Sequence, residues 1–288
     1  MAQSRFIASI ASAKPLSQAL AAGILLSVPF WRAGYGWLAI PCVIGYLLWL
    51  DRKPTTRQIW LSGIAFFAVV VNWLYRIHAT DLIPNNALAI LFLVLTFSIV
   101  VGSLSVGFLL FGYTYNKLGI EVSQPRSLIM IPALWALSEW GRSILFSVIG
   151  MGPGGTFGAH WNFGSLAFPA SMTPLGYAGR IVGQFGLSAL VLLLSLGVIF
   201  LIRKQWKWGS IAIGIILAIC TTGWLISPSS KGSTLRVGLL QLDDSSYSDY
   251  GYQRDLEAIT SSHTPSRPLD LFVLPEYSYI FTTNEYKV

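Results

Sequence analysis

Residues 87–115 read ALAILFLVLTFSIVVGSLSVGFLLFGYTY, a run of 29 residues without a charged side chain. A helix needs about 20 mostly apolar residues to cross the ~30 Å hydrocarbon core of a bilayer. This run is therefore long enough to span a membrane, and we interpret it as one tilted helix rather than two, despite the small residues between Gly102 and Gly107. It predicts an integral membrane protein.

Comparable apolar segments recur along the first 226 residues, and the whole chain is 54% hydrophobic and only 11% charged. An average globular protein has about 25% charged residues. The predicted fold is a mainly α-helical transmembrane bundle of about seven spans, at 16–31, 35–50, 58–77, 87–115, 128–148, 181–202 and 207–226. The first two spans are short, since sixteen helical residues reach only about 24 Å, and form either short helices or a re-entrant pair.

The positive charge of this bundle lies mostly in short loops. Residues 232–288 carry a net charge of −4, so the rest of the chain carries +11. With seven crossings, one side of the membrane receives ten basic residues: Arg5, Lys14, Arg52, Lys53, Arg57, Lys117, Arg126, Arg203, Lys204 and Lys207. The other side receives Arg32, Arg76 and Arg180 before the final domain. The positive-inside rule then predicts a cytoplasmic N-terminus and an external C-terminal domain. The bases are scattered and no binding motif accompanies them, so no nucleic-acid partner is expected.

Two ionisable residues lie inside the predicted span 128–148. Glu139 and Arg142 are three residues apart, so they share one helix face. Charged groups within a span are costly and usually face the bundle interior or a polar cavity. We expect the pair to face the interior near the external surface, as support for a substrate site, and to help order residues 149–180. The alternative is a structural ion pair near the membrane surface.

The connection 149–180 contains eight glycines, six of them between residues 150 and 164, and three prolines, together with large aromatic side chains. It breaks helices, yet it is too apolar for a solvated loop. Irregular backbone near a membrane lies at the interface, against protein or along a cavity. Two interpretations stay open: an interfacial loop with an aromatic belt, or a loop that lines a lipid-access site. His160 is expected to be interfacial rather than a ligand.

Three further polar or sulfur-containing side chains in the spans are assigned to packing. Cys42 and Cys220 lie in apolar runs and are expected to be small buried hydrophobic residues. Asn72 is expected to form a hydrogen bond between packed helices. The spacing of Cys, His, Asp and Glu matches no disulfide framework or metal site, so no cofactor and no metal are predicted.

The pattern changes after a linker at 227–233. In residues 234–288, Leu235–Leu242 and Leu269–Leu274 are predicted to be buried strands, with a helix at Tyr252–Ser262 between them. Strand, helix and strand within about 40 residues indicate a βαβ unit with parallel strands. Two strands and one helix cannot cover a sheet, so we expect 234–288 to be an incomplete domain and the chain to be a fragment.

Glu276 follows the second predicted strand and Pro275. Open α/β sheets place their chemistry beyond the carboxyl ends of parallel strands. A carboxylate held there beside apolar residues suits a general base. The alternative is an ordinary loop glutamate.

Four motifs together resemble the bacterial apolipoprotein N-acyltransferase family, in which a membrane bundle carries a nitrilase-like (carbon–nitrogen hydrolase) domain. They are FFAVVVNWLYRIH at 66–78, PALWALSEWGR at 132–142, RVGLLQ at 236–241 and DLFVLPE at 270–276. The chain differs from the family pattern at Ile149, where IGMGPG replaces a Gly-Phe-Pro-Trp turn, and at Gln241, where QLD replaces Gln-Gly-Asn.

The resemblance implies an acyl transfer through a thioester, with Glu276 as the general base. It implies a phospholipid as the acyl donor and a diacylglyceryl lipoprotein as the acceptor, in the bacterial inner membrane with the C-terminal domain in the periplasm. The family's catalytic lysine and cysteine would lie beyond Val288, so the chain as given is expected to be inactive.

Two other functions stay open from the sequence. One is a membrane-tethered nitrilase-like amidase or acyltransferase with a different acceptor. The other is a transporter or a non-catalytic membrane scaffold. A transporter is expected to show internal repeats with interrupted helices, and no such repeat is visible in the sequence.

Overall fold

The computed structural model describes residues 2–76, 83, 85–149, 158, 162–227, 237–239 and 271–273. The chain divides into two compact units, Met1–Ser227 and Pro228–Val288. The first unit is helical and the second contributes two short strands. The predicted helix at 252–262 lies outside the described residues, as do His160 and Glu276.

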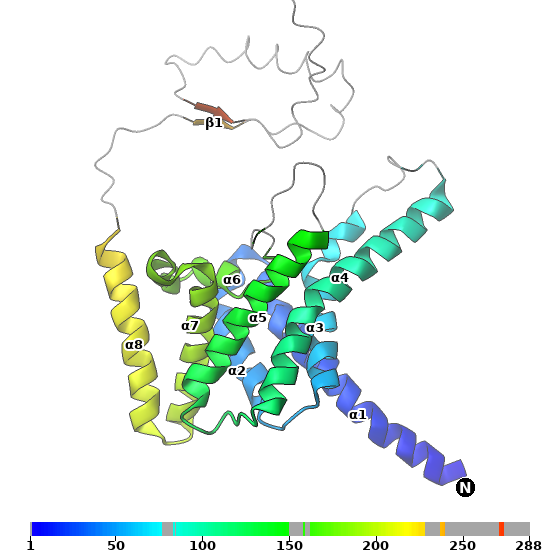
Figure 1. Ribbon diagram of the computed structural model, residues 1–288, viewed down its shortest axis with the longest axis horizontal. Helices are drawn as coiled ribbons and strands as arrows, with labels where there is room; N and C mark the ends of the chain where they lie inside the picture. The colour runs from blue at the N-terminus through cyan, green and yellow to red at the C-terminus, as the bar shows by residue number, and fades with distance from the viewer. Residues whose placement is uncertain are drawn as a thin grey trace, which may run out of the picture. The chain divides into compact units, whose positions relative to one another are not determined.

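The first unit contains long helices joined by short 3₁₀ segments (Figure 1). The α-helices are α1 (Ala2–Ser27), α2 (Ala39–Leu50), α3 (Thr56–Val70), α4 (Asn86–Lys117), α5 (Ser127–Ile149), α6 (Ala167–Ser171), α7 (Gly179–Ile202) and α8 (Trp206–Leu225). The 3₁₀ segments are η1 (Val28–Phe30), η2 (Ala33–Leu38), η3 (Asn72–Arg76) and η5 (Pro174–Ala178). Each predicted span overlaps a helix of the structure, but the span predicted at 58–77 is longer than α3, which ends at Val70 and is followed by η3.

Three helical stretches of the described chain are long and apolar enough to cross a membrane: α4, Pro174–Ile202 and α8. Helix α4 has 32 residues without a break, which confirms the prediction of one helix for 87–115. The apolar helical stretches before it, Pro15–Phe30, Gly34–Leu50 and Thr56–Val70, are shorter. The protein is therefore a helical membrane protein by length and composition, and the number of crossings remains a proposal.

The centre of the bundle is aromatic and lies where α2, α3, α4 and α5 meet. Phe108 of α4 contacts the rings of Tyr46, Phe66 and Trp135 at centroid distances of 6.3, 5.6 and 5.2 Å. Helix α3 approaches α4 closely because Gly63 leaves room for Phe108: a Cβ atom at Gly63 would lie 2.5 Å from its ring. Close approach at small residues is a common way for membrane helices to associate.

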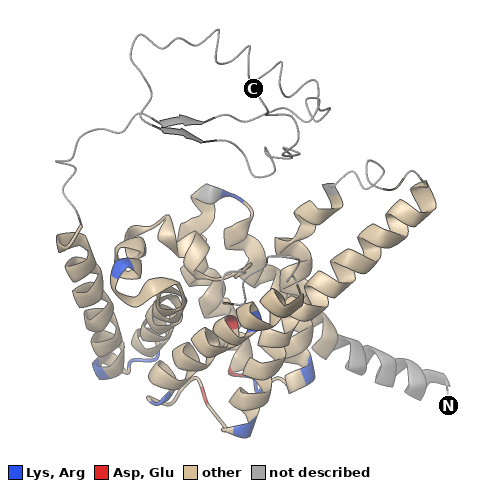
Figure 2. Cartoon of the chain, turned by 45° about the horizontal axis from the view of Figure 1, so that its top comes forward, with Lys and Arg blue, Asp and Glu red and all other residues tan. Residues whose placement is uncertain are grey.

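Two ion pairs join the loops at one end of the bundle. Lys53 Nζ lies 2.7 Å from Glu121 Oε1, and Arg203 Nη2 lies 2.7 Å from Asp51 Oδ2. The loops at 51–55, 118–126 and 203–205 therefore lie at the same end. Figure 2 shows most of the Lys and Arg positions there. This clustering agrees with the prediction that the three loops share one side of the membrane.

The second unit is described only at two strands. Strand β1 (Val237–Leu239) and strand β2 (Leu271–Val273) pair in parallel, with Val237 opposite Leu271. Each strand lies within a segment predicted to be a strand, and the parallel pairing is the one expected of a βαβ unit.

Candidate functional site

Glu139 and Arg142 lie on one face of α5, and each side chain is only 2% exposed. The indole nitrogen of Trp135, one helical turn earlier, donates a 3.0 Å hydrogen bond to Glu139 Oε1. The burial agrees with the expectation that both charges face the bundle interior. A buried charge needs hydrogen-bonding partners, because the free-energy cost of removing it from water is large.

Those partners come from the connection between α5 and α7. The hydroxyl of Ser165 donates a 2.9 Å hydrogen bond to Glu139 Oε2, and the backbone amide of Leu166 donates one of 3.1 Å to Oε1. With the indole of Trp135, three donors meet one carboxylate. A side chain that accepts hydrogen bonds from three points of the chain is suited to holding those points together.

A second hydroxyl extends this polar cluster to α7. The Oγ atoms of Ser165 and Ser188 are 2.9 Å apart, and the backbone amide of Ala167 donates to Ser188 Oγ at 3.0 Å. Helix α6 begins at Ala167, whose amide is shared between Ser188 Oγ of α7 and the nearby Ser165 Oγ, while the amide of the preceding Leu166 donates to Glu139 of α5. The first amides of any helix have no intrahelical partner. Glu139 and Ser188 therefore fix where α6 begins.

Arg142 binds the same connection at another point. Its Nη2 donates a 2.8 Å hydrogen bond to Asn162 Oδ1, and its guanidinium lies 4.8 Å from the centre of the Phe67 ring on α3. Helix α4 leaves room for it at Gly107, where a Cβ atom would lie 3.2 Å from Arg142 Cβ. The arginine thus ties the start of the described connection to α3 and α5.

Glu139 and Arg142 bind the segment that follows α5 rather than each other, and their support of a substrate site stays a prediction. Within the described residues, no salt bridge joins Glu139 to Arg142. Each side chain instead binds the segment that follows α5, one through Ser165 and Leu166 and the other through Asn162. The pair holds that segment against the bundle.

Four buried polar atoms of the described residues have no hydrogen-bond partner: Arg142 Nε, Ser143 Oγ, Asn162 Nδ2 and Gln184 Nε2. Two of them belong to the Arg142–Asn162 contact. The polar cluster therefore retains donor capacity beyond the bonds that it makes.

Sequence reasoning missed Asn162, Ser165 and Ser188. Their only signal is that small polar side chains stand in otherwise apolar surroundings, which is common in membrane helices. Among the predicted residues, Cys42 is buried, as expected, and Cys220 is half-buried. Asn72 is exposed on η3, so it is not packed between helices as predicted. Among the described residues, no group of three His, Cys, Asp or Glu side chains could hold a metal ion.

The sequence of this chain is similar to those of known proteins. Residues 22–197 match a family model described as the apolipoprotein N-acyltransferase N-terminal domain. An apolipoprotein N-acyltransferase of Coxiella burnetii is 30% identical over 237 residues, which cover 77% of this chain and 44% of that protein. One of Methylococcus capsulatus is 26% identical over 239 residues, or 79% of this chain and 44% of that protein. One of Shewanella oneidensis is 23% identical over 215 residues, or 71% and 38%. The matched region spans less than half of the length of these relatives.

Proposed function

This chain belongs to the apolipoprotein N-acyltransferase family, and from that premise we propose that it is part of an enzyme that moves an acyl chain from a phospholipid to a lipoprotein. The acceptor is the α-amine of an N-terminal diacylglyceryl-cysteine. The observation that carries the proposal is the match over residues 22–197, which includes Glu139, Arg142 and the segment that they hold. A membrane bundle suits this reaction, because both substrates are anchored in the bilayer by their acyl chains.

The proposed chemistry has two steps. A cysteine thiol gives its proton to Glu276, and the thiolate attacks the ester carbonyl of the phospholipid. The C–O bond of the ester breaks and Glu276 returns the proton to the departing alkoxide, which leaves a thioester and a lysophospholipid. The lipoprotein amine then attacks the thioester, forming an amide and restoring the thiol. A lysine would stabilise the oxyanion in each step. Of these three groups, residues 1–288 supply only Glu276 by motif.

We assign Glu139 and Arg142 a positioning role in this enzyme. This assignment is supported by the hydrogen bonds to Asn162, Ser165 and Leu166, which hold the segment before α6 against α5. In this proposal the segment lines a site through which lipid substrates enter the bundle. The two charges act through the backbone that they fix and not on the reacting atoms.

The proposed topology has seven crossings in the bacterial inner membrane, with a cytoplasmic N-terminus. Residues 234–288 then belong to a nitrilase-like domain on the periplasmic side. The support is the charge asymmetry of the sequence, the shared end of the three basic loops and the parallel pairing of β1 with β2.

The decisive experiment uses the complete gene product, including any residues that follow Val288, in vesicles of phosphatidylethanolamine with a labelled acyl chain. The expected result is a labelled protein whose label is released by hydroxylamine, as a thioester requires. Glu276→Gln keeps the size of the side chain and removes its basicity, so labelling should be lost. Glu285→Gln is the matched control and should label normally. Normal labelling of Glu276→Gln would show that another group is the base, and absence of label in the wild type would contradict the acyl-enzyme itself.

A further inference from the structure

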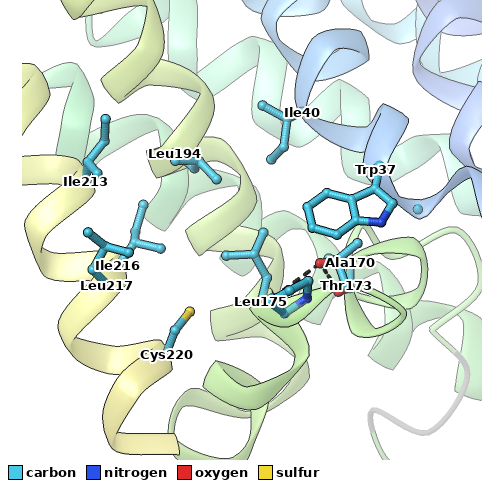
Figure 3. Close-up of a pocket in the computed structure, with 12 residues that line it drawn as sticks. Trp37, Ile40, Ala170, Thr173, Leu175, Leu194, Ile213, Ile216, Leu217 and Cys220 are labelled. Carbon is cyan, nitrogen blue, oxygen red and sulfur yellow. Dashed lines mark hydrogen bonds between the residues drawn. The ribbon is translucent and has the colours of Figure 1, made fainter. Parts of the chain in front are cut away.

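A cavity of about 240 Å³ lies in the first unit between η2, the α6–η5 segment, α7 and α8. Figure 3 shows Ile213, Leu217 and Cys220 of α8 on one side of it, with Trp37 of η2 and Leu175 of η5 across the space. Helix α8 packs on α7 and η5. The cavity therefore lies between α8 and η2, on the side of α8 that is not packed on α7 or η5.

Close backbone contacts fix two walls of this cavity. At Gly36, a Cβ atom would collide with the backbone oxygen of Pro169, so η2 lies directly against α6. At Gly223, a Cβ atom would collide with the backbone oxygen of Tyr177, so the end of α8 lies directly against η5. Neither contact can tighten, because both already bring backbone to backbone. The space between these walls is built into the packing of the helices.

The lining of the cavity is almost entirely apolar. The one hydroxyl, that of Thr173, donates a 2.7 Å hydrogen bond to the Ala170 oxygen and accepts one of 3.3 Å from the Leu175 amide. It is therefore occupied by the backbone of its own turn. Water needs two to four polar partners to stay in a cavity, and this lining does not offer them. A polar headgroup would be equally unfavourable there, whereas a hydrocarbon chain would not.

We propose that this cavity binds one acyl chain of a membrane phospholipid as a resident, non-reacting ligand. Helix α8 and the stretch containing α7 are both long and apolar enough to cross a membrane. The opening between α8 and η2 therefore faces hydrocarbon, and the molecules available to enter it are lipid chains. At that opening Leu217 is 61% exposed and Trp37 is 64% exposed.

The helices also indicate how the bound acyl chain is oriented in the cavity. From Cys220 to Ile213 the lining of α8 covers about 10 Å of helix, and Cys220 is the end nearer to Thr173 and the last turn of α8. Trp side chains concentrate at membrane interfaces, and η2, which carries Trp37, precedes α2. The carbonyl end of the chain is therefore placed near Cys220 and its methyl end toward Ile213.

This site is separate from the proposed acyl transfer, because no acidic or basic side chain among the described residues lines it that could activate the free thiol of Cys220 or stabilise an oxyanion. It is nevertheless connected to the polar cluster through α6. The start of α6 is held by Glu139 and Ser188, and Ala170, near its other end, lines the cavity. A chain bound in the cavity would therefore support the same short helix from its opposite side.

The test is photocrosslinking of the full chain in phosphatidylglycerol vesicles, with a diazirine placed either near the carbonyl or near the methyl end of one acyl chain. Labelled peptides are mapped by mass spectrometry. We expect the first probe to label the region around Cys220 and Leu175, and the second to label the region around Ile213. When the probe lipid is instead added stepwise to the protein in detergent, labelling of these peptides should saturate at a low probe concentration, as a specific site requires, whereas labelling of the lipid-facing side of α4 should rise in proportion to the probe.

Leu217→Trp fills the opening and should reduce labelling of the cavity peptides at least fivefold. Ile215→Trp is the matched control: it lies on the same helix, is 45% exposed and does not line the cavity. Its labelling should equal that of the wild type. Equal labelling in both variants, or labelling of α8 that follows exposure alone, would overturn the proposal. Crosslinks to a second copy of the chain at these residues would do so as well, by showing that protein fills the space. Because the readout is binding, failure here leaves the proposed acyl transfer untouched.

Discussion

The hydroxyl of Ser165 donates a 2.9 Å hydrogen bond to the carboxylate of Glu139, which lies 26 residues earlier in the chain. Both side chains are buried. One contact thus joins the middle of α5 to the irregular segment that leads into α6 and α7. The position of that segment depends on these polar contacts together with the apolar packing of Leu166, Ala167 and Ala170 in the core.

Ser165→Ala should lower the free energy of unfolding by about 1–3 kcal/mol, because Glu139 and Ser188 would each lose a buried partner. The measurement is the thermal transition of the purified protein in detergent. Ser171→Ala is the control: Ser171 is exposed and its hydroxyl bonds only to the Phe168 oxygen of its own helix. That variant should stay within about 0.5 kcal/mol of the wild type. Equal transitions in the two variants would show that the Ser165 contact does not stabilise the fold.

Arg142→Ala should expose the segment after Asn162 to proteolysis, since it removes the hydrogen bond to Asn162 and the contact with Phe67. Chymotrypsin is a suitable probe, because Phe163 and Phe168 lie in that segment. Cleavage there should be several-fold faster than in the wild type, and the folding yield and any acyl transfer should fall. Lys117→Ala, at the end of α4, should change none of these. If both variants are cleaved at the wild-type rate, the pair has no ordering role.

The helices of this protein could be predicted from sequence because the bilayer imposes one rule on all of them. A run such as 87–115 must satisfy its backbone internally, so its apolar length predicts a helix without knowledge of its neighbours. The inward orientation of Glu139 and Arg142 follows from the same reasoning, since lipid cannot solvate a charge. The parallel strands around Val237 and Leu271 were predictable because continuous apolar runs of that length are typical of buried strands.

The connection from α5 to α7 could not be predicted in the same way. Its glycines and prolines indicated irregular backbone, yet α6 and η5 form there. Helix α6 has only five residues, too few to be stable alone, and it begins where Glu139 and Ser188 accept the amides of Leu166 and Ala167. Those acceptors are 27 and 21 residues away in the chain. The sequence around α6 does not predict a hydrogen bond to a residue so distant in the chain.

The Lys53–Glu121 pair should make stability depend on pH at both extremes. The hydrogen bond from Lys53 lowers the pKa of Glu121, and the same bond raises the pKa of Lys53. Glu121 contributes to the free energy of unfolding above its unfolded-state pKa of about 4.3. This contribution is lost as the pH falls through the lower pKa of Glu121 in the folded state. The Lys53 contribution is present below about 10.4 and is lost as the pH rises through the higher folded value.

The check is the thermal transition of Lys53→Gln against the wild type from pH 3 to pH 11. The difference in transition temperature between the two proteins should be largest near neutral pH and smaller toward pH 3 and pH 11. It should also be smaller in high salt, because the ion pair is exposed. Lys204→Gln is the control for backbone strain, since Lys53 and Lys204 both have positive φ angles, of 55° and 62°. A difference between Lys53→Gln and the wild type that is constant with pH would assign the effect to the backbone turn instead of the charge pair.

The last prediction concerns topology. The two ion pairs place the loops that contain Asp51, Lys53, Glu121 and Arg203 at one end of the bundle. Helix α8 starts just after Arg203 and has 20 apolar-rich residues, about the length needed to cross the hydrocarbon core once. Its two ends should therefore face opposite sides of the membrane.

Because basic loops stay in the cytoplasm, a reporter fused at Lys53 should be cytoplasmic and one fused at Ser229 should be exported. Paired alkaline phosphatase and fluorescent-protein fusions give opposite signals for the two sides, so each fusion checks the other. Both reporters on one side would contradict the seven-crossing proposal, and a reversed pair would contradict its orientation while keeping the crossing of α8.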